Sequence, residues 1–162
     1  MKCTAMILFL FLPIFAGAHG SHSHGGDKGA KAHTHGAGLL DIGFDGLKGE
    51  IDFEVSAEAI LGHEKAPKSD AEKTEETKRL EIFKTKFQEA LEFQGANCTW
   101  SNVKVEVDRR KVGKVQHADV ELDADVNCET TIHNKILRFE LSKFYPGLKK
   151  VNVQINASEF QR

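Results

Sequence analysis

Alternation of apolar and polar residues recurs in this chain and constrains its fold more than any other feature. Such alternation sends successive side chains to opposite faces of a strand, so each run predicts a strand with one buried face. Asp45-Gly46 and Gly113 mark turns between neighbouring runs. The apolar members are Leu40, Ile42 and Phe44; Ile51, Phe53 and Val55; Val103, Val105 and Val107; Val120, Leu122, Ala124 and Val126; and Val151, Val153 and Ile155.

Two helices are predicted between these strands. Ser69 followed by Glu72 is typical of a capping box, and an apolar stripe at helical spacing then indicates a helix over 70–93. A second helix is predicted to end at Pro146-Gly147. The predicted fold is α/β of the α+β type, a mainly antiparallel five- or six-stranded sheet with two helices on one face. The repeated strand–helix–strand order allows an internal duplication. The stripes are Leu80, Phe83, Phe87 and Leu91, then Leu137, Leu141 and Phe144.

The first residues have the pattern of a secretory signal peptide. Lys2 precedes an apolar run over 6–15, and Ala16-Gly17-Ala18 is a small-residue cleavage site, so we expect residues 1–18 to be removed. Residues 19–32 hold no apolar side chain larger than alanine, which predicts a disordered tail. A single domain is expected over 33–162. No later run approaches the roughly 20 apolar residues of a membrane span.

Two cysteines remain after the signal peptide, Cys98 and Cys128. An oxidising compartment favours a disulfide between them, and two buried thiols are the alternative. A plain hairpin centred on Gly113 would place Cys98 opposite Cys128. It would also place Val103 opposite Asp123, which mixes the two faces, so both features together require either a bulge or cysteines that lie just outside regular pairing.

Histidines and carboxylates form the candidate metal ligands. The odd-numbered residues of the 117–125 strand share one face at about 7 Å spacing, and imidazole with carboxylate suits a divalent ion. A solvated strand face is the better interpretation of Glu121, Asp123 and Asp125. The remaining candidates are His117 and Asp119 on this strand, His33 and His35 before the first strand, His63 and Glu64 before Pro67, and His19, His22 and His24 in the tail.

The motifs HTHGAGLLDIGFDG, AILGHEKAPKSDAE, ANCTW, QHADVELDADVNC and FELSKFYPGLKKVNVQI occur in that order. This set resembles the ZrgA-like periplasmic zinc-binding proteins. The resemblance implies an α/β protein with a disulfide that handles zinc in the periplasm. It also implies ligand roles for His33, His35, His117 and Asp119. Lys65 stands where the family usually has a histidine, so either His63 substitutes for it or this part of the site is lost.

The chain is mildly acidic, with a formal net charge of −2, which does not suggest a nucleic-acid partner. No His-Glu-x-x-His run, nucleophile elbow or phosphate loop is present, so we expect no enzyme activity. Zn(II) is the expected ion, captured by the tail, held by the domain and passed to a metal transporter or buffered. Copper bound through an N-terminal His19 is one alternative. An envelope protein-interaction module with incidental metal binding is another.

Overall fold

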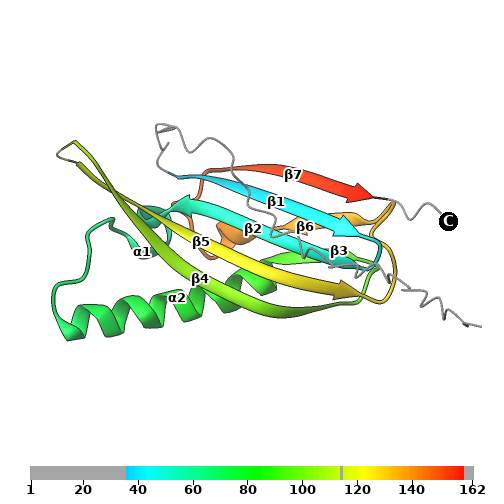
Figure 1. Cartoon of the computed structure of the whole chain (residues 1–162), viewed down its shortest axis with the longest axis horizontal. Helices are drawn as coiled ribbons and strands as arrows, with labels where there is room; N and C mark the ends of the chain where they lie inside the picture. The colour runs from blue at the N-terminus through cyan, green and yellow to red at the C-terminus, as the bar shows by residue number, and fades with distance from the viewer. Residues whose placement is uncertain (1–35, 114, 159–162) are drawn as a thin grey trace, which may run out of the picture. The chain divides into compact units, whose positions relative to one another are not determined.

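A five-stranded sheet in the order β4-β5-β2-β1-β7 forms one layer of the computed structural model (Figure 1). The structure describes residues 36–113 and 115–158. Neighbouring strands are antiparallel except for the parallel pair of β1 and β7. The elements are β1 (Ala37–Asp45), β2 (Lys48–Ser56), α1 (Ala57–Leu61), α2 (Asp70–Ala90), β3 (Leu91–Gln94), β4 (Cys98–Val112), β5 (Val115–Cys128), β6 (Ile136–Phe139), the 3-10 helix η1 (Leu141–Lys143) and β7 (Lys150–Ser158).

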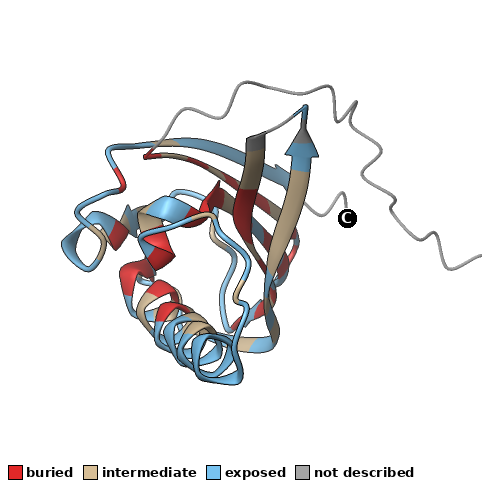
Figure 2. Cartoon of the chain, turned by 90° about the vertical axis from the view of Figure 1, so that its left-hand side faces the viewer, coloured by how far each residue is buried: buried red, intermediate tan, exposed pale blue. Residues whose placement is uncertain are grey.

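Helix α2 and the small β3–β6 sheet contribute the second layer, and the core lies between the layers (Figure 2). Aromatic rings join the layers: the ring centroid of Phe53 on β2 is 5.1 Å from that of Phe87 on α2 and 5.9 Å from that of Phe139 on β6. The predicted apolar faces of β1, β2 and β5 are buried in this core. The predicted α/β class with a mainly antiparallel sheet and two helices is therefore confirmed.

The β1–β2 hairpin follows the prediction. Leu40 pairs with Phe53 and Ile42 with Ile51, so apolar side chains share the core face. The turn between the strands contains Gly46 at a φ of 62°. This left-handed conformation is open to glycine and strained for most other residues.

Helix α2 begins as the capping box predicts. The Glu72 N–H donates to Ser69 Oγ at 3.2 Å, and Glu72 Oε2 accepts from the Ser69 N–H at 2.8 Å. These reciprocal bonds occupy donors that the first turn of a helix otherwise leaves without partners. They also lower the pKa of Glu72, because backbone and side-chain hydrogen bonds from Ser69 favour its charged form.

Replacing Ser69 with alanine removes the capping acceptor. We expect Ser69→Ala to lower the free energy of unfolding by about 1 kcal/mol. Denaturant unfolding of the variant beside Ser101→Ala, which changes an exposed strand serine, measures this. Equal midpoints for the two variants would show that the cap contributes nothing to stability.

The second predicted helix is wrong. Ile136–Phe139 is strand β6, which pairs antiparallel with β3, and only the 3-10 turn η1 follows it. Leu137, Leu141 and Phe144 have helical spacing, but Phe139 also packs against Phe53 and Phe87, and strand pairing with β3 places it there. The second strand–helix–strand unit therefore lacks its helix, and the second helix of the fold is the short α1.

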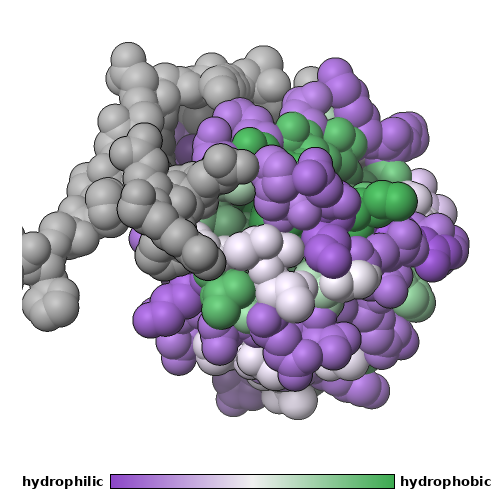
Figure 3. All heavy atoms as spheres, turned by 90° about the vertical axis from the view of Figure 1, so that its right-hand side faces the viewer, coloured by the Kyte–Doolittle hydropathy of each residue, from purple (hydrophilic) through white to green (hydrophobic). Residues whose placement is uncertain are grey.

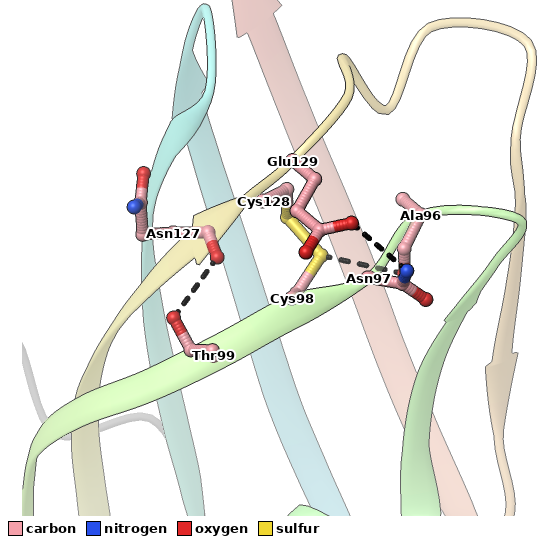
Figure 4. Close-up of a disulfide and its surroundings, with 7 residues drawn as sticks. All are labelled: Ala96, Asn97, Cys98, Thr99, Asn127, Cys128 and Glu129. Carbon is pink, nitrogen blue, oxygen red and sulfur yellow. Dashed lines mark hydrogen bonds between the residues drawn. A yellow bond between two sulfur atoms is a disulfide. The ribbon is translucent and has the colours of Figure 1, made fainter.

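The β4–β5 hairpin contains both the predicted bulge and the predicted disulfide. The register shifts between Ser101 and Lys104, where Asn102 has a φ of 52°. Beyond the bulge Val105 pairs with Leu122, so apolar residues share one face, while Cys98 still pairs with Cys128. The bond between their sulfur atoms is drawn in Figure 4. The bulge thus reconciles the apolar alternation with the cross-strand disulfide.

Several predictions lie outside the described residues: the signal peptide over 1–18, the tail over 19–32, and the ligand roles of His33 and His35. The described residues belong to one compact unit, 32–162. Within them, no helix has both the length and the apolar character needed to cross a membrane.

Candidate metal centre

His117 and Glu64 lie together at the start of β5. Strand β2 pairs with β5 only as far as Ser56 opposite Asp119, so His117 lies beyond the end of β2. Glu64 comes from the segment between α1 and α2, and its Oε2 is 3.7 Å from His117 Nδ1. Both side chains are partly shielded, at 29% exposed for His117 and 17% for Glu64. Fold topology thus joins two candidate ligands that are 53 positions apart in the sequence.

The separation of these two side chains suits a shared zinc ion. Imidazole nitrogen binds zinc at about 2.0 Å and carboxylate oxygen at about 2.1 Å, so two such ligands of a tetrahedral ion are about 3.4 Å apart. The 3.7 Å between His117 Nδ1 and Glu64 Oε2 is close to that value. It is longer than an ordinary hydrogen bond, for which N–H···O distances reach about 3.2 Å.

Asp119 is the most buried acidic group of this region. Only 2% of its side chain is exposed, and its Oδ2 accepts a hydrogen bond from Arg110 Nη2 at 2.6 Å. Arg110 also lies 3.0 Å from Asp108 Oδ2 and 3.8 Å from Glu54 Oε1. Burial lowers the pKa of Arg110, but the Asp119 hydrogen bond and the neighbouring carboxylates outweigh it and raise this pKa. Arg110 therefore stays charged and balances Asp119.

Sequence reasoning missed the role of Arg110. The residue stands in the basic run Arg109-Arg110-Lys111, which reads as an exposed hairpin tip. In the structure Arg110 pairs with His117, which places it diagonally from Asp119 on the same face. The available signal was the opposite charge of Arg110 and Asp119 on neighbouring strands. Recognising the pair required the register of β4 and β5 between the bulge and the turn, which the sequence did not determine. Metal-binding carboxylates commonly receive such a hydrogen bond from an outer group.

The two candidate ligands of the loop, His63 and Glu64, differ in exposure. His63, one of the two possibilities left open for the histidine missing at Lys65, is exposed, and so is Lys65. Glu64 is the residue that lies beside His117. Within residues 36–113 and 115–158, no three His, Cys, Asp or Glu residues are grouped closely enough to hold a metal ion. Further ligands would have to come from elsewhere in the chain or from rearrangement.

Chain connectivity brings the first described residues to the same end of the sheet. The carbonyl oxygen of Gly36, which directly follows His35, accepts from the Lys150 N–H at 3.1 Å. Gly38 pairs with Val55 on β2, and Val55 pairs with Val120 on β5. The described chain therefore starts two strands from Asp119, at the end of β5 where His117 lies.

The solvent-facing side of the main sheet is strongly acidic. Carboxylates stand directly opposite one another across strands, as Asp52 pairs with Asp123, Glu50 with Asp125 and Glu54 with Glu121. The first four of these residues line a shallow pocket of about 350 Å³ together with Asn102 and Lys104. Like charges in register destabilise a sheet slightly and create a field that concentrates cations. Glu121, Asp123 and Asp125 belong to this face.

The fold and the partial site define a small α/β domain with imidazole and carboxylate donors at one end of an acidic sheet. The family described as ZrgA family zinc uptake protein matches residues 32–162. The chain therefore belongs to this zinc uptake family. No curated protein matches it.

Proposed function

We propose that this protein captures Zn(II) in the periplasm and delivers it for uptake or transfer, or buffers it. Membership of a zinc uptake family supports zinc as the cargo. The observation that carries the proposal is the approach of His117 Nδ1 and Glu64 Oε2 to 3.7 Å, near the distance between two ligands of one zinc ion. The proposed role is binding and release, without catalysis. A metal transporter is the proposed recipient.

The proposed zinc ligands are His33, His35, His117 and Asp119, with Glu64 as the contribution from the loop in place of His63. Glu64 is preferred because it lies beside His117, whereas His63 is exposed. Arg110 would orient the Asp119 carboxylate through its hydrogen bond to Oδ2.

The tail and the acidic sheet have a supporting role in the proposal. His19, His22 and His24 would capture zinc weakly and rapidly, and the cross-strand carboxylates raise the local cation concentration. Zinc binding requires neutral imidazoles, so acidification would release the ion. This division of roles predicts that the folded site, rather than the tail, sets the affinity.

Calorimetric zinc titration of a protein lacking residues 19–31 but keeping His33 onward tests the proposal. We expect one defined site in this shortened protein, and we expect His117→Ala to weaken its zinc affinity by about tenfold or more. Loss of a nitrogen ligand leaves an incomplete coordination shell, which is the physical reason. Glu64→Gln, which keeps the side-chain shape and removes the charge, is expected to weaken binding as well.

The matched control is His133→Ala. His133 is an exposed histidine in the segment before β6, so its removal subtracts an imidazole without touching the proposed centre. Unchanged zinc stoichiometry and affinity in the His117→Ala protein would remove His117 from the site. Loss of all zinc binding on deleting residues 19–31 would show that the folded domain is not a zinc receptor.

A further inference from the structure

The two edges of the main sheet are built differently. Strand β4, at one edge, carries a run of charged residues over 108–111 and the bulge between Ser101 and Lys104. Charges and bulges are devices by which proteins prevent strand addition at an edge. Strand β7, at the other edge, pairs with β1 from Lys150 to Ser158 without a register shift. It holds neither proline nor a charged residue after Lys150.

Strand β7 also exposes apolar side chains. Val153 is 43% exposed and Ile155 is 48% exposed. Val153 pairs with Leu40 and Ile155 with Ile42, and both partners are buried. Val153 and Ile155 therefore lie on the face of the sheet that is buried at the other strands. Figure 3 looks at the end of the domain where β7 finishes and shows hydrophobic atoms gathered in its upper part, among hydrophilic ones. The buried face of the sheet thus reaches β7 without being fully covered there.

The hydrogen-bonding groups of β7 alternate in direction. The Lys150 N–H donates toward β1, to the Gly36 carbonyl oxygen, so residues of the same parity face β1. Val151, Val153, Ile155 and Ala157 therefore direct their N–H and C=O groups toward the outer edge. No strand within the described residues pairs with that edge. A strand laid antiparallel against it would meet a continuous row of donors and acceptors.

We propose that β7 is a dimerisation edge, at which β7 of a second copy of this chain adds antiparallel and joins the two sheets into one. The sequence of the strand is self-complementary about Gln154. In this register Val153 stands opposite Ile155 of the partner subunit, Val151 opposite Ala157 of the partner subunit, and Asn152 opposite Asn156 of the partner subunit. Apolar residues meet apolar residues and amides meet amides.

Charge and symmetry favour a second copy over an unrelated strand. Each Lys150 would face Ser158 of the partner subunit, so the register opposes no like charges, which is unlike the acidic rows elsewhere in the sheet. A two-fold axis through Gln154 uses the same surface on both subunits, as isologous dimers do. The outward-facing residues form hydrogen-bonded pairs, and the core faces of both subunits lie on the same side.

Sedimentation equilibrium of the mature protein in EDTA tests the proposal, because the chelator prevents zinc from bridging histidines of two molecules. We expect a dimer, and we expect Val153→Lys/Ile155→Lys to be monomeric because lysines would oppose lysines across the seam. A Val153→Glu/Ile155→Glu protein is also expected to be monomeric. Mixing the two should restore a one-to-one heterodimer, since each lysine then faces a glutamate.

The matched control is Ile82→Lys on α2. Ile82 is 47% exposed, nearly the same as Ile155, so this variant introduces a single lysine at a similar exposure away from β7. This variant should remain dimeric. Circular dichroism of each variant shows whether the fold is kept.

A cysteine pair tests the register even if the charged variants fold poorly. Gln154→Cys should form an intermolecular disulfide under mild oxidation, because residues at the two-fold axis are about 4.5 to 5.5 Å apart between Cα atoms. Asn152→Cys should cross-link mainly when mixed with Asn156→Cys. A monomeric wild-type protein across the micromolar range overturns the proposal. So does a dimer that survives both charged variants, or one that forms only with zinc.

Discussion

Replacing Cys98 and Cys128 together with alanine should lower the free energy of unfolding by about 3 to 4 kcal/mol. The disulfide closes a loop whose ends are 30 positions apart, and cross-linking such a loop removes conformational entropy from the unfolded chain. Alanine is chosen because Cys128 is only 3% exposed, so a serine there would add the cost of burying a hydroxyl. Guanidinium unfolding at neutral pH measures the loss.

The surroundings of the disulfide should limit the damage to the fold itself. Thr99 Oγ1 donates to the Asn127 carbonyl oxygen at 3.2 Å, and Asn97 Nδ2 donates to Glu129 Oε2 at 2.9 Å (Figure 4). These cross-strand bonds hold the same end of the hairpin without the cross-link. The double-alanine variant should therefore keep a native circular dichroism spectrum at room temperature while unfolding at a lower denaturant concentration.

Single replacement of Cys98 provides the control. Cys98→Ala breaks the same cross-link but leaves Cys128 in place, so its loss of stability should match that of the double variant to within about 1 kcal/mol. A double variant as stable as the wild type would contradict the chain-entropy argument.

Replacing Arg110 with methionine should destabilise the protein by about 2 to 4 kcal/mol. Asp119 is 2% exposed, and its Oδ2 accepts the 2.6 Å hydrogen bond from Arg110. Methionine keeps much of the aliphatic length but removes the charged hydrogen bond to the buried carboxylate. We place the effect below the upper limit for buried pairs because Arg110 is itself 34% exposed, so water can reach part of the vacated space.

A double-mutant cycle separates the ion pair from packing. Arg110→Met combined with Asp119→Asn removes both charges, so the double variant should lose less than the sum of the single variants. Arg138→Met is the comparison outside this cluster, because Arg138 is 49% exposed and pairs with the partly exposed Glu140. Additive losses for Arg110 and Asp119 would contradict a coupled pair, and so would a loss for Arg138→Met equal to that for Arg110→Met.

Local rules accounted for much of the fold. The capping box at Ser69 and Glu72 depends on residues three positions apart, and the β1–β2 hairpin depends on adjacent runs joined by a glycine turn. Such features need only the local chain, so their pattern was sufficient. The wrong helix over 137–144 shows the opposite case. There the spacing fitted a helix, but pairing with β3, whose residues lie 42 to 48 positions earlier, placed Leu137 and Phe139 on a strand.

The candidate site also contains residues that local spacing predicted and a residue that only the tertiary structure could select. His117 and Asp119 were predicted from their common parity on one strand, and the structure confirms that they share that strand. Glu64 was predicted as a possible ligand beside His63, and no local signal could choose between them. The choice depends on how the loop after α1 passes the start of β5, which extends beyond the end of β2.

From the sequence alone came the strand alternation, the capped helix, the resemblance to a zinc-binding family and the conflict between the apolar alternation and a plain hairpin that joins Cys98 to Cys128. The strands and the helix cap follow from residue patterns over short stretches of chain. The conflict follows because pairing of the two cysteines must agree with the apolar alternation of the strands that carry them. Only the tertiary structure decided that Glu64 approaches His117, that Arg110 balances Asp119 and that Val153 and Ile155 remain exposed. The reason is that each depends on strand order and on which layer covers which strand, and residues far apart in the chain determine both.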